Sequence, residues 1–322
     1  MSEPKIVILG AGSIGVAFAA AFSDCGADVV ITDPDPARRC TVAEMLDGQY
    51  RAIETAGLGR GANGGVTVTD QSDAAVGQAD LVLEAGPEDL AIKRQIFARL
   101  LQHAGQDTIL ATASSAIPMS RILPQPEQQA RALVAHPVNP PSVLRLIELV
   151  PAPGTSKSVL ERAQTLFARM GFAAVTLGHE MEGFVLNRLQ GAVLREAYRL
   201  VAEGVADVEG VDTVMRLGLG PRWALSGPFE TAELNTPGGI GAHAARMGPA
   251  YRAMGQARGE TDCDWPEALV AEVARQRRAV LPMNDLPGRV AWRADAVARL
   301  VATRDSLARH DNDPQPNADN PA

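Results

Sequence analysis

Cysteine, basic clusters and long apolar runs are all scarce in this chain of 322 residues. The three cysteines, Cys25, Cys40 and Cys263, lack metal-ligand spacing, so we expect reduced thiols in a cytoplasmic protein and no metal site. No cluster of basic residues occurs, and the formal net charge is -8, so nucleic acid and anionic membranes are poor partners. No stretch approaches the roughly 18 apolar residues of a membrane-spanning helix.

What the sequence does contain is enough apolar material, 46% of residues, to bury more than one hydrophobic core. The first apolar run, "IVIL", is too short for the core of a signal peptide and leads directly into a glycine motif, so we expect no secretory leader.

Short β-branched runs alternate with helical stretches through the first half of the chain. We predict strands in six segments: 5–10, 27–33, 79–85, 107–114, 130–136 and 145–150. Helices are expected between them, for example over 14–24 and 89–103, and a glycine-rich surface loop over 57–65. Strands that alternate with helices predict an α/β fold with a doubly wound, mostly parallel sheet of the Rossmann type.

After about residue 183 the strand-like runs stop and helical patterns follow over 183–203, 208–217, 267–281 and 290–305. We therefore predict a nucleotide-binding domain over 1–183 and a mostly α-helical domain over 184–305. The polar, Pro- and Asn-rich tail, 306–322, is expected to be disordered.

The stretch "GAGSIG" has the spacing of a dinucleotide-binding turn, and it lies between a predicted strand and a predicted helix. Gly10 allows the tight turn, Gly12 lets the backbone approach a pyrophosphate, and Gly15 lets helix and strand pack closely. Ser13 and Ile14 complete the turn at the helix N-terminus, which favours phosphate charge.

An acidic residue follows the motif at the distance that the ribose of a dinucleotide requires. Asp33 lies 18 residues after Gly15, at the end of the second strand. Its carboxylate can accept from the ribose 2'-hydroxyl and would repel a 2'-phosphate, which favours NAD over NADP. The neighbouring Arg38 and Arg39 leave NADP open, and a glycine turn that binds no nucleotide is the alternative.

His136 and Glu148 occupy two apolar runs, where an unpaired polar group is costly. The two residues are 12 positions apart, so an antiparallel hairpin centred on Ser142 would place them directly opposite each other. The glutamate would then fix the tautomer of the imidazole, whose second nitrogen could act as a general base. A purely structural pair is the alternative.

Two further positions carry polar side chains where a ligand is expected. Ser114 and Ser115 follow a predicted strand, at the edge where open α/β sheets bind ligands. Asn187 lies in a helix that is apolar on most faces, so we expect a buried amide that needs partners. A turn serine and a backbone-capping asparagine are the structural alternatives.

Together, the motifs resemble the 3-hydroxyacyl-CoA dehydrogenase superfamily, and within it the L-gulonate 3-dehydrogenase/lambda-crystallin branch. They are "GAGSIG", "EAGPEDLAIK", "ASSAIP", "AHPVNPP…IELVP", "GFVLNRLQ…EA" and "GLGPRWALSGPFE", in the family's order over about residues 4–305. The resemblance implies an NAD-dependent enzyme that oxidises a 3-hydroxyl, and a homodimer.

The resemblance also implies roles for single residues. His136 would be the general base and Glu148 its orienting partner, while Ser114, or Ser115 after a one-residue slip, and Asn187 would bind the reacting oxygen. Glu88 and Lys93 match residues near the nicotinamide ribose, and their alternative is a solvated charge pair on a helix.

The substrate is less well specified by the sequence. Arg222 matches an arginine of the free-acid branches and could hold a carboxylate, or it could pair with a protein carboxylate or reach solvent. We expect a free 3-hydroxy acid, with L-gulonate first. A carnitine 3-dehydrogenase, a (S)-3-hydroxyacyl-CoA dehydrogenase and a dinucleotide-binding structural protein of the crystallin kind are the alternatives.

Overall fold

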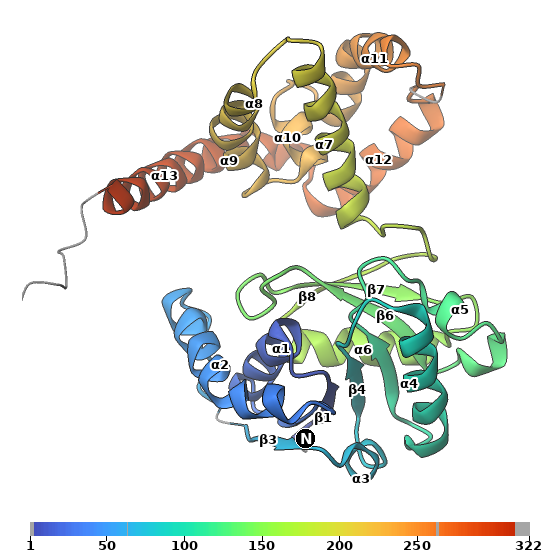
Figure 1. The fold of residues 1–322 in the computed structure, drawn as a ribbon. Coiled ribbons are helices and arrows are strands. Elements are labelled where there is room, and N and C mark those ends of the chain that lie inside the picture. Colours follow the sequence, from blue (N-terminus) through green and yellow to red (C-terminus); the bar gives the residue numbers. More distant parts are fainter. Residues whose placement is uncertain (1–2, 63, 262–263, 313–322) are drawn as a thin grey trace, which may run out of the picture. The chain divides into compact units, whose positions relative to one another are not determined.

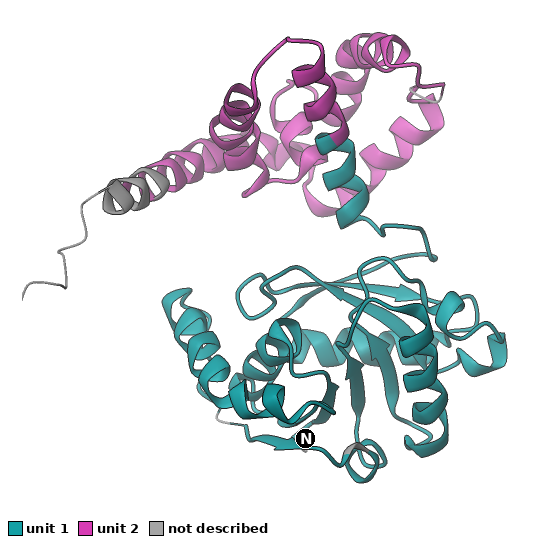
Figure 2. Ribbon diagram, viewed as in Figure 1, with its two compact units in different colours: residues 1–194 teal, residues 195–322 magenta. Residues whose placement is uncertain are grey.

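A computed structural model describes residues 3–62, 64–261 and 264–312 (Figure 1). The chain forms two compact units, residues 1–194 and 195–322 (Figure 2). In the described part of the chain, none of the helices is long and apolar enough to cross a membrane.

Unit 1 is built on one eight-stranded sheet with the order β3-β2-β1-β4-β5-β6-β7-β8. Its strands are β1 (Lys5–Leu9), β2 (Asp28–Thr32), β3 (Val66–Thr69), β4 (Leu81–Glu84), β5 (Ile109–Thr112), β6 (Ala132–Pro137), β7 (Leu146–Pro151) and β8 (Ala173–Thr176). All neighbours pair in parallel except β6 and β7, which are antiparallel. The predicted Rossmann-type, doubly wound and mostly parallel sheet is confirmed.

Helices cover both faces of this sheet (Figure 1). The helical elements of unit 1 are α1 (Ser13–Asp24), α2 (Pro36–Thr55), α3 (Ser72–Val76), α4 (Leu90–His103), α5 (Met119–Ile122), a 3-10 turn (Pro126–Gln128) and α6 (Lys157–Arg169). Side chains of α1, α2 and α6 pack into one apolar cluster with the sheet, and side chains of α4 and α5 pack into the other. Both faces are therefore buried, which explains the continuous apolar strands.

Two strands escaped the sequence prediction, and both lie at the edges of the sheet. β3 reads "VTVT" and β8 reads "AAVT". Only Val66 and Thr69 of β3 and Ala174 of β8 are even partly buried. An edge strand packs few apolar side chains, so its sequence carries little of the pattern that identified the buried strands.

Unit 2 consists of helices throughout the part that the structure describes. They are α8 (Val208–Val214), a π-helical turn (Met215–Leu219), α9 (Gly220–Trp223), α10 (Pro228–Leu234), α11 (Gly239–Ala257), α12 (Glu267–Val280), a 3-10 turn (Met283–Asp285) and α13 (Leu286–Asn312). The helix α7 (Leu186–Ala202) begins in unit 1 and ends in unit 2.

Carboxylates of α10 hold the helices of unit 2 together. Glu233 is fully buried and pairs with Arg277 at 2.8 Å and with Arg278, both on α12. Glu230 accepts from Arg289 of α13 at 2.9 Å, and that guanidinium also stacks on Trp292. A buried carboxylate requires such cationic partners, so these pairs fix which helices pack on α10.

The last helix extends beyond its predicted end. We predicted a helix over 290–305 and disorder over 306–322, whereas α13 runs to Asn312. Helix-forming residues such as Leu307, Ala308 and Arg309 continue the pattern, and the first proline comes only at Pro314. Residues 313–322, and with them the rest of the predicted tail, lie outside the described residues.

An aromatic cluster under the sheet gives a test of this core. Phe22 of α1 is fully buried, and its ring centroid lies 5.3 Å from Phe18, 5.8 Å from Phe172 and 6.0 Å from Phe167. We expect Phe22→Ala to lower the free energy of unfolding by about 3–5 kcal/mol, because it leaves a cavity that its neighbours cannot fill. Guanidinium unfolding followed by circular dichroism measures this loss.

Leu144→Ala serves as the control, since that side chain is 46% exposed and should change stability by less than about 0.5 kcal/mol. A loss below about 1 kcal/mol in Phe22→Ala would show that the cluster collapses around the missing ring.

Candidate active site

The glycine turn between β1 and α1 is crowded at two of its three glycines. Gly10 has φ of +121°, and a Cβ there would lie 2.6 Å from the carbonyl oxygen of Ala85. A Cβ at Gly15 would overlap the carbonyl oxygen of Gly10. These two positions require glycine for the chain to fold as it does.

Gly12 is different, because a Cβ built there meets no atom within 4 Å. It caps the N-terminus of α1, a twelve-residue helix whose first N–H groups, from Ser13 and Ile14 onward, lack partners within the helix. Open space in front of a helix N-terminus suits the pyrophosphate of a dinucleotide, so the turn fits such a cofactor.

Asp33 follows β2 and is fixed beside this turn. One of its carboxylate oxygens accepts from the backbone N–H of Ala11 at 2.9 Å, and the other accepts from the N–H of Asp35 at 2.9 Å. A carboxylate has about four lone-pair sites, so both oxygens can still accept from ribose hydroxyls.

Arg38 and Arg39, which kept NADP as an alternative cofactor in the sequence analysis, interact with groups of the protein itself. Arg38 lies between Asp33 and Asp35, at 3.8 and 3.9 Å, and Arg39 donates to the backbone carbonyls of Asp33 and Pro34. The carboxylate beside them supports a ribose with a free 2'-hydroxyl, as in NAD.

His136 and Glu148 are direct partners across the β6–β7 pair, and this predicted register is confirmed. Nδ1 of His136 lies 2.7 Å from Oε2 of Glu148, and both side chains are almost fully buried. The ring of Phe184, with its centroid at 5.3 Å, packs against the imidazole. A carboxylate on Nδ1 favours the tautomer in which Nε2 can accept a proton.

The second oxygen of Glu148 holds the start of α7. Oε1 accepts from the backbone N–H groups of Val185 at 2.9 Å and Leu186 at 3.0 Å. Gly183 and Phe184, with φ of +77° and +50°, turn the chain so that these two N–H groups face the carboxylate. Burial raises the pKa of Glu148, but the bonds from His136, Leu186 and Val185 outweigh it and hold the pKa below its usual value.

Glu84, at the carboxyl end of β4, is a buried acceptor that sequence reasoning missed. It has no exposed surface and accepts from Lys93 at 2.8 and 3.0 Å, from Thr112 at 2.5 Å and from the N–H of Gly86 at 2.7 Å. The sequence signal that could have identified Glu84 is an acidic residue at the end of an apolar strand, nine residues before a lysine.

Lys93 is buried, so the alternative of a solvated charge pair between Glu88 and Lys93 is wrong for the lysine. Its ammonium lies 3.6 Å from Glu88, whose side chain is partly exposed. Oε1 of Glu88 accepts from Ser114 Oγ at 2.6 Å and from the N–H groups of Ala116 and Ser115 at 2.8 and 3.1 Å. Burial raises the pKa of Glu88, yet the bonds from Ser114 and Ala116 and the charge of Lys93 leave it below its usual value.

The two candidate serines have different surroundings. The hydroxyl of Ser114 is buried, donates to Glu88 and accepts from the N–H of Ile117 at 2.8 Å. Ser115 is exposed, and among the described residues its hydroxyl has no hydrogen-bond partner. Its carbonyl oxygen accepts from Nδ2 of Asn187 at 3.0 Å, so the structure brings this serine and Asn187 together.

Asn187 is less buried than expected. Its residue is only partly covered, and α7 has no fully buried residue. The predicted burial was wrong because the apolar residues of α7 do not all face a core; Leu189, Leu194 and Tyr198 are more than half exposed. The amide has a backbone partner and one N–H left to donate.

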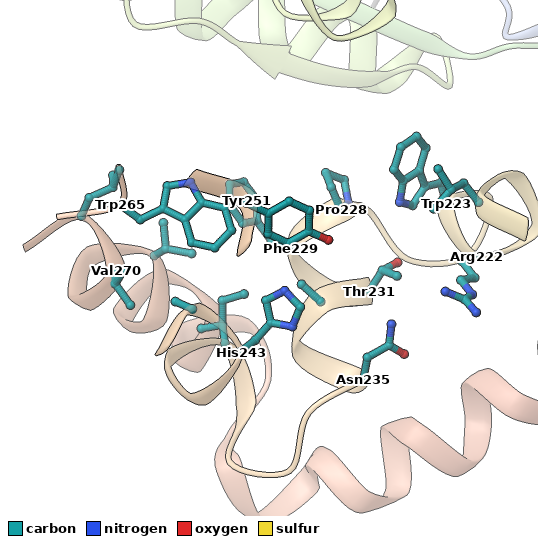
Figure 3. Close-up of a pocket in the computed structure, with 16 residues that line it drawn as sticks. Arg222, Trp223, Pro228, Phe229, Thr231, Asn235, His243, Tyr251, Trp265 and Val270 are labelled. Atoms are coloured by element: carbon teal, nitrogen blue, oxygen red, sulfur yellow. The ribbon is translucent and has the colours of Figure 1, made fainter. Parts of the chain in front are cut away.

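Arg222 belongs to unit 2, where it lies on α9 and borders a pocket (Figure 3). Its side chain is exposed, and its guanidinium makes no ion pair with any carboxylate of the described residues. The residues described contain no cluster of His, Cys, Asp and Glu that could hold a metal ion. Cys25 and Cys40 are free thiols, and Cys263 lies outside the described residues.

Known families match almost the whole chain. Residues 5–181 match the profile of the 3-hydroxyacyl-CoA dehydrogenase NAD binding domain, and residues 183–280 match that of the C-terminal domain of the same dehydrogenase. The cofactor is thus NAD, in agreement with the surroundings of Asp33.

Curated relatives cover much of the same length. A 3-hydroxyacyl-CoA dehydrogenase of Gibberella moniliformis is 32% identical, covering 93% of this chain and 91% of the relative. A lambda-crystallin homolog of Bos taurus is 34% identical over 94% and 96%, and an L-carnitine dehydrogenase of Streptomyces griseus is 34% identical over 76% and 74%.

A solved structure shares the fold. It is the crystal structure of 5-formyl-3-hydroxy-2-methylpyridine 4-carboxylic acid 5-dehydrogenase, an NAD+ dependent dismutase, which is 28% identical with a TM-score of 0.70. The match covers 95% of this chain and 99% of that one.

The lowered pKa of Glu148 predicts how stability depends on pH. A glutamate in the unfolded chain has a pKa of about 4.3, which is above the pKa of Glu148 in the folded protein. Between these two pKa values the unfolded state therefore binds more protons than the folded state. The stabilisation is complete above the unfolded pKa and is lost as the pH falls through the folded one. We expect Glu148→Gln to flatten the acid side of the stability profile, measured by urea unfolding between about pH 3 and 6.

Glu44→Gln, at an exposed position of α2, is the matched control and should keep the wild-type slope. If Glu148→Gln kept that slope as well, the carboxylate would not be stabilised by His136 and the start of α7.

Proposed function

The chain belongs to the 3-hydroxyacyl-CoA dehydrogenase family, and from this premise we propose that it oxidises the 3-hydroxyl of a free 3-hydroxy acid to the 3-oxo acid. The observation that carries the chemistry is the buried His136–Glu148 pair at 2.7 Å. NAD supplies the hydride acceptor when bound, so the residues of the chain have to manage the proton and the substrate oxygen.

His136 is the proposed general base. Glu148 accepts from Nδ1, so Nε2 is the nitrogen that takes the hydroxyl proton, and the carboxylate stabilises the imidazolium that results. A purely structural His136–Glu148 pair is the alternative. The carboxylate, its lowered pKa and the family membership together favour the catalytic role.

Ser115 and Asn187 are the proposed donors to the substrate oxygen. The Ser114 hydroxyl donates to Glu88, whereas the Ser115 hydroxyl has no hydrogen-bond partner among the described residues. The backbone carbonyl of Ser115 accepts from the Asn187 amide. Donors aimed at the oxygen as it becomes a carbonyl stabilise the transition state. Ser114 then acts through Glu88, which together with Lys93 is our proposed neighbour of the nicotinamide ribose.

Arg222 is the proposed anchor for the substrate carboxylate, because its guanidinium can form two parallel hydrogen bonds with such a group. Similarity to the gulonate branch makes L-gulonate the first compound to test. The L-carnitine dehydrogenase relative and the family name keep L-carnitine and the CoA ester as alternatives. Lambda-crystallin homologs keep a structural protein as the non-enzyme alternative.

The division into domains at residue 183, the homodimer and the cytoplasmic location stay predictions. For the dimer, unit 2 offers exposed apolar side chains, among them Trp292, Val280 and Met254. An interface of suitable size would bury such side chains on both copies.

NADH formation from four compounds tests the proposal: L-gulonate, L-carnitine, 3-hydroxybutyrate and 3-hydroxybutyryl-CoA. We expect turnover of a free acid, and a loss of about 10²–10⁴ in kcat for His136→Gln, which cannot act as the base. His103→Gln, an exposed histidine at the end of α4, should keep the wild-type rate.

The other outcomes are equally informative. Turnover of the CoA ester alone would contradict the free-acid proposal. NADH binding without turnover of any of the four would favour the structural protein.

The two serines make a paired prediction. We expect Ser115→Ala to lower kcat/KM by about 10²-fold, because it removes a donor to the reacting oxygen. Ser114→Ala should mainly lower the free energy of unfolding, by about 1–2 kcal/mol, because Glu88 loses a partner. Steady-state kinetics and urea unfolding of both variants give the comparison; a larger kinetic loss in Ser114→Ala with unchanged stability would reverse the assignment.

A further inference from the structure

Unit 2 contains a pocket of about 440 Å³, of which the proposed chemistry has used only Arg222 (Figure 3). Its walls come from the π-helical turn and from α9, α10, α11 and α12, together with Trp265. This volume lies in the range of small-molecule sites, which are concave, largely apolar and equipped with few polar groups.

Aromatic rings form much of the wall. Tyr251 and Trp265 lie 5.5 Å apart between centroids, and Phe229 lines the same pocket. Trp223 borders the pocket next to Arg222. The faces of these rings and the aliphatic side chains of Leu269 and Val270 can cover an apolar or aromatic body.

The polar groups of the wall are few, and several lack partners. Within the described residues, no hydrogen bond engages the guanidinium of Arg222, the side-chain amide of Asn235 or the hydroxyl of Tyr251. Thr231, in contrast, bonds to Ser226, and Nδ1 of His243 lies 3.1 Å from the hydroxyl of Thr236. Unengaged donors beside apolar walls fix the orientation of a ligand.

The charge of the pocket has one sign. None of the described residues that line it is acidic, whereas Arg222 is a cation. A second cation lies near: Nη1 of Arg293 on α13 is buried without a partner among the described residues. Burial, and after it the charge of Arg222, lower the pKa of Arg293, and Glu230 opposes this only in part. An anion beside Arg222 would relieve that repulsion.

We propose that this pocket binds a monocarboxylate with an apolar or aromatic body, its carboxylate on Arg222 and its body against Phe229, Tyr251 and Trp265. The inference rests on the proposed function in one respect: the acid that Arg222 binds is the substrate. It then narrows the substrate class to 3-hydroxy acids with an aliphatic or aromatic chain.

The pocket disfavours one other member of the class. A polyol such as L-gulonate would leave its hydroxyls against apolar walls, which is costly without hydrogen-bond partners. L-carnitine carries its own carboxylate for Arg222, and its quaternary ammonium would gain from the aromatic faces, so the pocket does not exclude it.

Tryptophan fluorescence of the whole protein tests the binding site. The chain has three tryptophans, of which Trp223 and Trp265 line the pocket, so a Trp292→Phe background leaves only these two reporters. The probe is 3-phenylpropanoate, which has the carboxylate and the ring but no hydroxyl to oxidise. We expect a saturable change in emission, confirmed by calorimetry.

Variants assign the signal to the pocket. Arg222→Gln should weaken the Kd of the probe by about tenfold or more, since it removes a charge-assisted bond. Arg216→Gln is the matched control, an exposed arginine of the same unit outside the pocket, and should leave the Kd unchanged. Ala232→Phe and Ala244→Phe, which fill the pocket from α10 and α11, should abolish binding. Circular dichroism melts show which of the two filled variants folds.

Several results would overturn the proposal. One is the absence of saturable binding, which is also expected if a second copy of the chain covers the pocket; sedimentation of the same samples identifies that case. Another is binding that the filled, folded variant leaves unchanged.

Turnover separates this proposal from the proposed function. We expect kcat/KM for 3-hydroxyhexanoate to exceed that for L-gulonate by about tenfold or more, from the methylenes that it buries. Turnover of L-gulonate with no binding of the probe would overturn the pocket inference and leave the proposed function intact. Binding of the probe with no turnover of any free acid would overturn the proposed function and its link to the pocket, while the carboxylate site itself would stand.

Discussion

One carboxylate, that of Glu148, connects three parts of unit 1. It joins β6 to β7 through His136, and it joins β7 to the start of α7 through the backbone N–H groups of Val185 and Leu186. The register of the β6–β7 pair, which is the one antiparallel pair among the described strands, brings the imidazole to it. The left-handed residues Gly183 and Phe184 bring the helix to it. A neutral residue at this position would leave buried donors without an acceptor, which explains an acid within an apolar strand.

A second buried carboxylate organises the neighbouring strand ends. Glu84 fixes Lys93 and Thr112, Lys93 lies near Glu88, and Glu88 fixes Ser114 and the backbone after β5. The loop that carries Ser115 is thus held by charge-assisted bonds in addition to the apolar packing of Ala113 and Ile117. A reacting group gains from such fixed surroundings, because catalysis requires its position to be set before the substrate binds.

The sequence predicted the features that depend on local pattern. Buried strands, the glycine turn, Asp33 and the opposition of His136 and Glu148 followed from apolar runs, spacing and the symmetry of a hairpin. Features that depend on distant partners did not follow: β3 and β8 carry little apolar pattern, and Glu84 acquires its meaning only from residues on other elements. Likewise, the two adjacent serines differ in the hydrogen bonds of their hydroxyls, which depend on residues far away in the sequence. The exposure of one face of α7 depends on which elements pack against that helix, and this too is not visible in its own sequence.

The glycine turn combines two kinds of constraint that look identical in the sequence. At Gly10 and Gly15 a methyl group would collide with the backbone of the protein itself, so the fold requires glycine. At Gly12 the fold leaves room for a methyl group, and the reason for glycine there lies in what occupies that space when NAD binds. Two glycines of the motif are therefore required by the packing of the protein itself, and the third is required by the space that its cofactor occupies.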